Sequence, residues 1–278
     1  MPRAMERTPR LPSSLGQLTM ETTARCRVAG ATLLRADAAT IAQARRQPIA
    51  VGTEKLAVSI LKHADDQTML ALLAVLEALE IHRWRDQSFA DWGVIAAPTF
   101  FGRVNSALAI QRYRQEGAWG VSPHLIPHQS LHASSGTISQ LLKIHGPNFG
   151  VGGGPNPAPD SLLFAAALLA DGSLPGLWLI VTGHESEWIP AADGAAVPPP
   201  ICQAAALALT PWQPHGDGPQ LSIGQLRFGT NAAGALAHVP EFHLNLLAEE
   251  WTASAGLPIG RWRLGEAHCL EIDVEARA

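Results

Sequence analysis

The chain is organised around residues 144–185, whose pattern is that of a strand, a helix and a second strand. Residues 149–154 are extended and rich in glycine, residues 160–170 are apolar on every side, and residues 177–182 form an unbroken apolar run. A helix without a polar face belongs inside a large domain. A strand without polar alternation is covered on both faces, as in a parallel or mixed sheet. The pattern therefore predicts an α/β fold.

The connections between these segments contain residues typical of turns and of helix N-termini. His145–Asn148 reads His-Gly-Pro-Asn, which is typical of a turn. Prolines occupy positions 155, 157 and 159, at the entry of the predicted helix, where proline is tolerated because the first helical N–H groups have no partner. Asp160 suits the positive end of the helix dipole. The glycines before the helix indicate that the backbone passes close to another part of the protein.

The periodicity predicts further elements on both sides of this stretch. The clearest is a helix over residues 65–79, where apolar side chains follow the i, i+3, i+4, i+7 spacing and Asp65 or Asp66 supplies the cap. We also expect strands over 27–34, with a bulge at Gly30, and over 221–228, with a bulge at Gly224. The other expected elements are strands over 92–100, 203–209 and 268–274, helices over 37–45, 105–115, 137–143 and 242–253, and a surface loop over 191–200.

The order of these motifs resembles the β-ketoacyl-ACP synthases of the thiolase-like superfamily. The resemblance rests on the His-Gly-Pro-Asn turn, the short strand, the buried helix and the following strand. Upstream, Val121–Pro127 is similar to the family's SPxxxP segment, and Ala133–Gly136 resembles its small-residue stretch. Gly183–Glu185 matches the end of the family's GGxE motif, with Thr182 in place of the first glycine. The resemblance covers residues 25–230.

This resemblance implies a fold and a domain layout. The fold is a thiolase-like N-terminal half, a mixed sheet with a buried helix, followed by a shortened C-terminal part. We expect a disordered tail over residues 1–24 and a single domain over 25–278. The family's two active-site histidines lie in the second half of its fold, of which this chain has room for a stub only.

The chain departs from the family at the nucleophile. Condensing enzymes carry a cysteine at the N-terminus of the buried helix, and counting from Pro147 places that position at Pro155. Proline has neither a nucleophilic atom nor a side-chain proton to transfer. No catalytic residue is therefore expected at this position, and the chain alone is not expected to be a condensing enzyme.

Relatives without the cysteine and without most of the second half resemble chain length factors, especially the short type paired with ketosynthases of aryl polyene pathways. The resemblance implies a non-catalytic subunit that shapes an acyl or polyketide tunnel beside a catalytic ketosynthase, served by an acyl carrier protein. The strand that pairs across the family's dimer axis corresponds here to Phe149, Gly150, Val151, Gly152, Gly153 and Gly154. The tunnel candidates, for which ordinary core packing is the alternative, are Phe100, Phe101, Leu125, His128 and Leu131.

Two other functions remain open on sequence grounds. One is a stand-alone homodimer that holds an acyl group on a carrier protein or on coenzyme A without reacting. The other is a decarboxylase or acyltransferase of changed mechanism that uses His128, His132 or His184 as its polar group. A neighbouring gene for an intact ketosynthase favours the chain length factor, and its absence favours the stand-alone homodimer.

Composition excludes several classes of partner. The 278 residues are 47% hydrophobic with a mean hydropathy of +0.08, which is typical of a globular protein with a large core. A net charge of −4 argues against nucleic acid or an anionic membrane surface as the main partner. No apolar run reaches the ~18–20 residues of a membrane span, and the N-terminus lacks the apolar core of a secretory signal. We therefore expect a cytoplasmic protein without membrane insertion.

Five smaller patterns add little to the functional interpretation. His124, His128 and His132 recur every four residues, but the prolines between them forbid a regular zinc-binding helix. The glycine run before the buried helix matches neither phosphate-binding motif. His184 and Glu185 lack the H-E-x-x-H spacing, and the family's glutamate is structural there. We thus expect no metal and no cofactor. The last two patterns are residue counts: Cys26, Cys202 and Cys269 are expected to be reduced thiols, and most of the eight tryptophans to pack in the core.

Overall fold

An eight-stranded mixed sheet forms the centre of the protein in a computed structural model, which describes residues 20–123, 125–152, 154–186, 200–212, 219–226, 239–265 and 268–274. The strand order is β5-β4-β6-β7-β1-β8-β10-β9. β4 pairs in parallel with β5 and β6, and the other pairs are antiparallel. The strands are β1 (Met20–Ala36), β4 (Gly93–Pro98), β5 (Asn148–Gly150), β6 (Leu177–His184), β7 (Cys202–Pro211), β8 (Pro219–Leu226), β9 (Gly260–Leu264) and β10 (His268–Val274).

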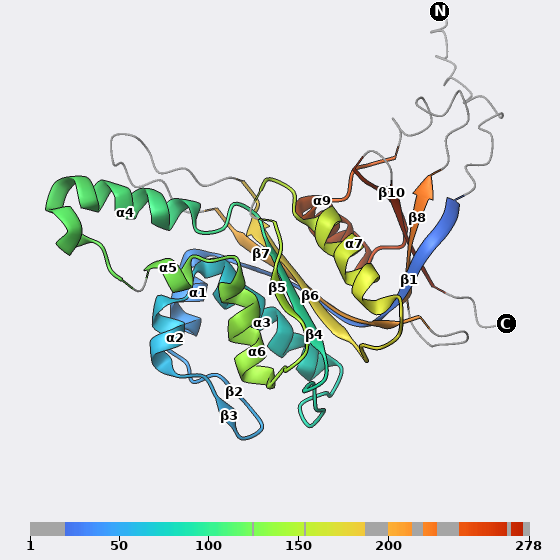
Figure 1. The fold of residues 1–278 in the computed structure, drawn as a ribbon, viewed down its shortest axis with the longest axis horizontal. Coiled ribbons are helices and arrows are strands. Elements are labelled where there is room, and N and C mark those ends of the chain that lie inside the picture. Colours follow the sequence, from blue (N-terminus) through green and yellow to red (C-terminus); the bar gives the residue numbers. More distant parts are fainter. Residues whose placement is uncertain are drawn as a thin grey trace, which may run out of the picture.

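Helices cover both faces of this sheet. α3 and α6 lie on one face and α7 and α9 on the other, while α4 extends away from the sheet (Figure 1). A small hairpin, β2 (Ala50–Val51) and β3 (Glu54–Lys55), lies below α6 in the same view. The helices are α1 (Ala38–Ala44), α2 (Val58–His63), α3 (Asp66–Ile81), α4 (Arg103–Glu116), the 3-10 turn η1 (Gly117–Gly120), α5 (Leu125–His128), α6 (His132–Leu142), α7 (Ala158–Leu169) and α9 (Leu244–Ser254).

Alternate residues of the central strands feed two separate cores. On β6, Trp178 and Ile180 pack in the core that contains α3, whereas Leu179 and Val181 pack in the core that contains α7. β7 divides in the same way, with Ala204, Ala206 and Ala208 on the α3 side and Ala205, Leu207 and Leu209 on the α7 side. Because both faces are covered, the strands show no polar alternation. The predicted α/β fold with a buried helix is thus confirmed.

Most of the predicted elements are present, with shifted ends. α3 begins at Asp66 with Asp65 as its cap, whose carboxylate accepts the Gln67 N–H at 2.9 Å. α6 starts five residues before the predicted helix. The hydroxyl groups of its first turns form hydrogen bonds within the protein, so these polar residues are accommodated in the helix. Ser134 bonds Thr68 of α3 at 2.8 Å, and Thr137 donates to the Ala133 carbonyl. The sequence pattern missed β2, β3, α2, α5 and β9, all of which are short.

The strand predicted over residues 149–154 is wrong in its extent. β5 ends at Gly150, and Gly152 has a φ of +94°, which takes the backbone out of the extended path. Residue 153 lies outside the described part of the chain, as do the predicted loop over 191–200, except its last residue, and the end of the strand predicted to reach Phe228. The described β8 ends at Leu226.

Two bulges lie at or opposite the predicted positions, and both are on β1. The register shifts between Val28 and Gly30, so Ala29 is the extra residue beside the predicted position. A Cβ on Gly30 would lie 2.6 Å from the Trp84 ring and 2.8 Å from the His82 ring, which explains the glycine. The second bulge lies between Thr22 and Ala24, opposite Gly224 rather than on its strand. The prediction at Gly224 therefore had the right place in the sheet and the wrong strand.

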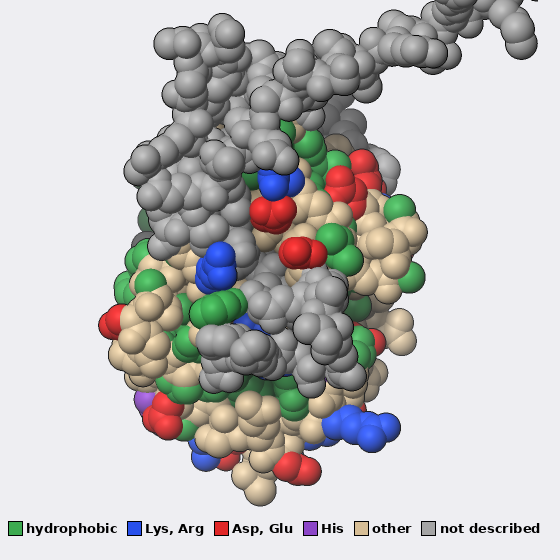
Figure 2. Space-filling model, turned by 90° about the vertical axis from the view of Figure 1, so that its right-hand side faces the viewer, with side chains coloured by type: hydrophobic (Ala, Val, Ile, Leu, Met, Phe, Trp, Pro, Cys, Tyr) green, Lys and Arg blue, Asp and Glu red, His purple; other side chains and the backbone are tan. Residues whose placement is uncertain are grey.

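The surface carries no sign of a membrane-spanning segment in the described residues. No helix there combines the length and the apolar character that a span requires. On the face shown in Figure 2, described acidic and basic side chains are interspersed with apolar and neutral ones.

The three cysteines are buried free thiols. Burial raises the pKa of Cys26 to about 12 and that of Cys269 to about 11, and it also raises the pKa of Cys202. Because the thiolate is the reactive form, we expect a small disulfide reagent at pH 8 to modify the folded protein at least ~100-fold more slowly than the unfolded protein. Counting thiols before and after denaturation checks this, and rapid modification of any cysteine in the folded state would contradict it.

Candidate functional site

A pocket of about 600 Å³ opens at the carboxyl ends of β4 and β6. Because these two strands are parallel, Thr99 after β4 and His184 at the end of β6 lie at the same edge of the sheet. The N-terminal end of α3 and the inner face of α4 form two further walls. The carboxyl ends of parallel strands are where open α/β sheets bind their ligands, so this pocket is the candidate functional site.

Pro155 lies in the wall of the pocket, three residues before the start of α7 at Ala158. It also lines an adjoining pocket of about 330 Å³, together with Thr99, His184 and Asn245, which line both. No cysteine is among the described residues that line either pocket. The side chain at the expected nucleophile position is therefore next to the cavity and chemically inert.

A buried hydrogen-bond chain joins the floor of the pocket to α3. Gln67 is 3% exposed, donates to the Thr99 carbonyl at 2.9 Å and accepts from the Thr182 hydroxyl at 2.9 Å. Thr182 is the residue that stands where the resembled motif has a glycine. The chain fixes the ends of β4 and β6 to the first turn of α3. Sequence reasoning missed Gln67, although a polar residue within the apolar pattern of residues 65–79 was a usable signal.

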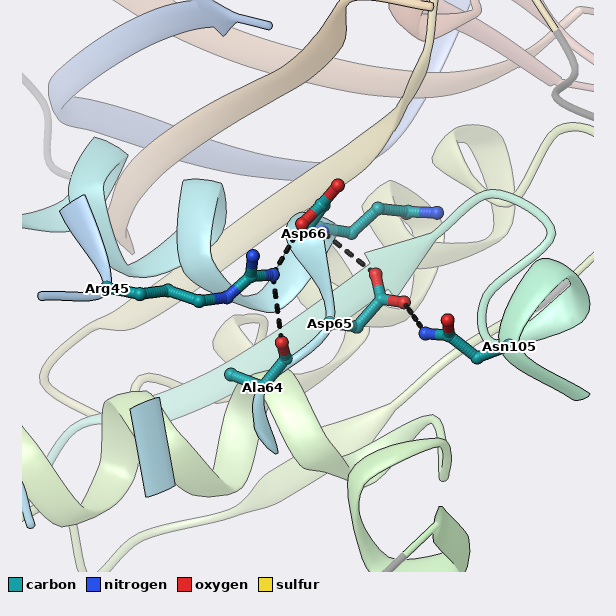
Figure 3. Close-up of polar contacts among 6 residues, drawn as sticks. Arg45, Ala64, Asp65, Asp66 and Asn105 are labelled. Atoms are coloured by element: carbon teal, nitrogen blue, oxygen red, sulfur yellow. Dashed lines mark hydrogen bonds and ion pairs between the residues drawn. The ribbon is translucent and has the colours of Figure 1, made fainter. Parts of the chain in front are cut away.

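Two adjacent carboxylates at the start of α3 face different partners (Figure 3). Asp66 pairs with Arg45, whose guanidinium also donates to the Ala64 carbonyl at 3.0 Å. Asp65 accepts from the Asn105 amide of α4 at 2.9 Å, in addition to capping α3. The Arg45 ion pair and the Asn105 bond thus attach α1 and α4 to the same helix end.

Burial perturbs two titratable groups in this pocket. Desolvation raises the pKa of Asp65 to about 6, and the charge of Asp66 adds to the effect, while the Gln67 N–H and Arg45 oppose it. Desolvation also lowers the pKa of His184, which the charge of Asp66 partly opposes. In both groups burial favours the neutral form. The pocket therefore places a carboxyl and an imidazole of altered acidity near Pro155.

Glu185 has structural contacts. Its carboxylate pairs with Arg35 of β1, and its backbone N–H donates to the Ile201 carbonyl at 3.0 Å. Its carbonyl accepts from the Asn245 amide at 3.1 Å, which ties the end of β6 to α9. These partners hold the strand end in place and leave the neighbouring His184 in the pocket wall.

The tunnel candidates from the sequence are not all brought together. Phe100 and His128 line the pocket, whereas Phe101 and Leu131 are not among its lining residues. The side chain of Leu125 lies outside the described part of the structure. Of the histidines considered as polar groups, His128 and His184 line the pocket, and His132 contacts Ser135 of its own helix. Among the described residues, no group of three or more His, Cys, Asp or Glu could hold a metal.

The predicted interface segment lies at the edge of the sheet, because β5 is the terminal strand. Phe149 is 40% exposed and packs edge-on against Phe164 of α7, with ring centroids 5.0 Å apart. Two of the glycines serve contacts within the chain. A Cβ on Gly150 would lie 2.3 Å from the Leu131 backbone, and one on Gly152 would lie 2.2 Å from Pro157. A bulky residue at Gly152 would therefore distort the chain itself and would not test an interface.

No protein-family model and no curated protein matches the chain. Among solved structures, the ishigamide ketosynthase/chain length factor aligns at 14% identity with a TM-score of 0.51, covering 84% of this chain and 74% of that one. The ApeO ketosynthase with its chain length factor ApeC from Xenorhabdus doucetiae aligns at 15% identity with a TM-score of 0.48, covering 92% and 99%.

A third structure, the AntDE:AntF complex of a type II PKS acyl-carrier protein with its ketosynthase, aligns at 15% identity with a TM-score of 0.49. It covers 68% of this chain, which spans 63% of the length of that one. The likeness to the ishigamide structure establishes the fold: the chain has the thiolase-like fold of ketosynthases and chain length factors.

Proposed function

We propose that this protein is a non-catalytic, chain-length-factor-like subunit that works with a catalytic ketosynthase in fatty acid or polyketide-type biosynthesis. The observation that carries the proposal is Pro155, which lies in the wall of the pocket at the position where the resembled enzymes need a nucleophile. A cyclic side chain without a nucleophilic atom leaves the pocket able to bind an acyl group but unable to form a covalent intermediate at this position. The three cysteines offer no substitute, since all are buried away from the pocket lining.

In this proposal the pocket contributes to an acyl tunnel. Phe100 and His128 form part of its wall, and Phe101, Leu125 and Leu131 belong to the same proposed set. The proposal treats residues 25–278 as one cytoplasmic domain, and an acyl carrier protein delivers the growing chain. Support for the ketosynthase partner comes from the solved structure of similar fold, the ishigamide ketosynthase/chain length factor. The acyl carrier protein is what the resemblance in sequence implies.

The partner subunit would pair at β5. The segment from Phe149 to Gly154 includes the edge strand, whose outer side has no neighbouring strand among the described residues. Phe149 is a large apolar side chain left half-exposed there. Unpaired strand edges favour association with another chain. A catalytic ketosynthase or a second copy of this chain would fit this edge, and the experiments below separate the two.

The activity assay compares the chain alone, a candidate catalytic ketosynthase from the same organism, and the two together. We expect no ketoacyl product from the chain alone with malonyl-ACP and an acyl-ACP primer, and product from the pair. In the pair, Phe100→Ala should lengthen the product by removing part of the tunnel wall, whereas Tyr113→Ala, an exposed side chain on α4, should not. Condensation by the chain alone would overturn the proposal.

A decarboxylase is the second candidate, and one observation favours it. His184 lines both pockets beside Pro155, and burial lowers its pKa, so that a neutral imidazole faces the cavity at pH 7. The same assay tests this function, because loss of carbon dioxide from malonyl-ACP yields acetyl-ACP without a primer. If acetyl-ACP forms and His184→Gln abolishes it, the decarboxylase replaces the chain-length-factor proposal.

A further inference from the structure

Helix α4 is unusual because none of its 14 residues is buried. In Figure 1 it extends away from the sheet, beyond the helices that cover it. Asn105, Leu108, Ala109 and Arg112 recur at helical spacing and line the pocket, so one face of α4 forms a wall of the cavity. On the other side, Ile110 and Tyr113 are 55% and 57% exposed. The helix therefore covers the pocket without being anchored in either hydrophobic core.

Both ends of α4 are flanked by glycines with a positive φ. Gly102 before the helix and Gly117 after it each have a φ of +70°. Glycine reaches such values without steric cost and changes them readily. Hinges in proteins are a few residues at element ends that absorb backbone rotation. A Cβ on Gly117 would meet open space, so no packing restrains that end. A Cβ on Gly102 would lie 2.8 Å from the Gln129 side chain, so only glycine fits at the other end.

A hydrogen bond attaches the start of this wall to the protein body. The Asn105 amide donates to Oδ2 of Asp65 at 2.9 Å, joining the first turn of α4 to the cap of α3 (Figure 3). At the glycine-bounded start of the helix, Gly102 supplies no side-chain cap, and the Arg103 guanidinium lies over the Phe100 ring at 4.9 Å. The Asn105–Asp65 bond thus joins the first turn of α4 to the wall of the pocket formed by α3.

We propose that α4 is a hinged lid over the pocket, which rotates about Gly102 and Gly117 and is held closed by the hydrogen bond between Asn105 and Asp65. Opening would expose the pocket face of α4, the α3 cap and the cavity between them to water. This inference concerns access to the pocket and does not depend on what the pocket holds, so it stands or falls separately from the proposed function.

The charge on Asp65 sets the direction of a pH effect. In the closed position burial raises the pKa of this carboxyl to about 6, and an exposed aspartate has a pKa of about 3.9. Protonation therefore favours the closed lid, and ionisation favours the open lid, in which water reaches the carboxylate. With these two values, the ratio of closed to open lid falls by at most about tenfold between pH 5 and pH 8.

Other charged groups around Asp65 bear on the same equilibrium. Asp66 raises the pKa of Asp65 and Arg45 lowers it. The charged and titratable side chains that share the pocket or interact with Asp65 are Lys62 and His63 of α2, Arg103 and Arg112 of α4, His128 of α5, His184 and Glu185 at the end of β6, and Cys202 of β7. Asp65 is the carboxyl among them that contacts α4 through Asn105. Substituting Asp65 therefore isolates the effect of its charge on the position of α4.

The test measures the position of α4 directly. Because the native cysteines are buried, spin labels attach selectively to Gln111→Cys on the exposed side of α4 and Glu77→Cys on the exposed side of α3. Pulsed electron–electron double resonance on the full chain, diluted with unlabelled protein, gives the distribution of distances between the two spin labels. We expect one dominant short distance at pH 5. At pH 8 the ratio of the longer-distance population to the shorter-distance population should be higher by up to about tenfold.

Three variants separate the lid from general loosening. Asp65→Asn keeps a neutral, bonding side chain, so the short distance should dominate at both pH values. Asn105→Ala should show the longer population at both, and Ser106→Ala, the matched control on the same helix, should behave as the parent does. The same distribution in the parent and in Asn105→Ala overturns the lid. A pH response that survives Asp65→Asn overturns the role of Asp65.

Discussion

Replacing Trp178 by alanine should lower the free energy of unfolding by about 3–5 kcal/mol, the largest stability loss we expect from a single side chain. Trp178 is fully buried on β6, and its ring lies between 5.6 and 6.2 Å, centroid to centroid, from the rings of Phe89, Trp84 and Trp92. Removing the indole ring leaves a cavity between β6 and the aromatic residues that follow α3. Urea denaturation of the parent and variant measures the difference.

Trp178→Phe provides the control, because the indole N–H of Trp178 is buried without a hydrogen-bond partner among the described residues. Phenylalanine keeps most of the aromatic contact and removes that unpaired donor, whose burial is itself unfavourable. We expect this variant to lose about 1 kcal/mol. If alanine and phenylalanine at this position were equally stable, the aromatic cluster would not be the support of the sheet that its packing implies.

The centre of the fold was predictable from the sequence because local pattern and burial agree there. Residues 160–170 and 177–182 are apolar on nearly every side, and the structure places them in α7 and β6. β6 is buried on both faces, whereas α7 buries one face and leaves Ala167 exposed and Leu163 and Phe164 partly covered. The ends were less predictable. Gly152 and Gly150 carry no side chain that would report their backbone angles or the close approach of Leu131, so the sequence predicted one strand where the structure has a strand and a turn.

The candidate site was predictable only in part. Pro155 and His184 were located by counting within motifs, and both line the pocket. Gln67 and the Asn105–Asp65 bond were not found, because they depend on contacts between residues 32 to 115 positions apart. Asp65 was predicted as a helix cap, which it is, but its second partner on α4 leaves no trace in local periodicity. Phe101 and Leu131 are not among the residues that line the pocket, so their place in an acyl tunnel stays a prediction.

Replacing Phe149 by arginine should weaken the proposed subunit pairing at β5 by at least ~100-fold. The side chain is 40% exposed on the edge strand and rests on Phe164 of α7, which makes it the large apolar group available to a partner there. A charged group at this position would have to lose its hydration without a partner, which opposes association. Because Phe149 lies outside the two buried cores, the monomer should keep its thermal stability.

Ile81→Arg is the matched control, since Ile81 is 59% exposed at the end of α3, away from the sheet edge. Light scattering at micromolar concentration, for the chain alone and with a candidate catalytic ketosynthase, separates a second copy from a heterologous partner. If the parent forms a complex that Ile81→Arg preserves and Phe149→Arg abolishes, β5 is the interface. A parent chain that stays monomeric both alone and with the ketosynthase would contradict the proposed pairing at β5. A Phe149→Arg variant that associates as well as the parent would exclude β5 as the interface.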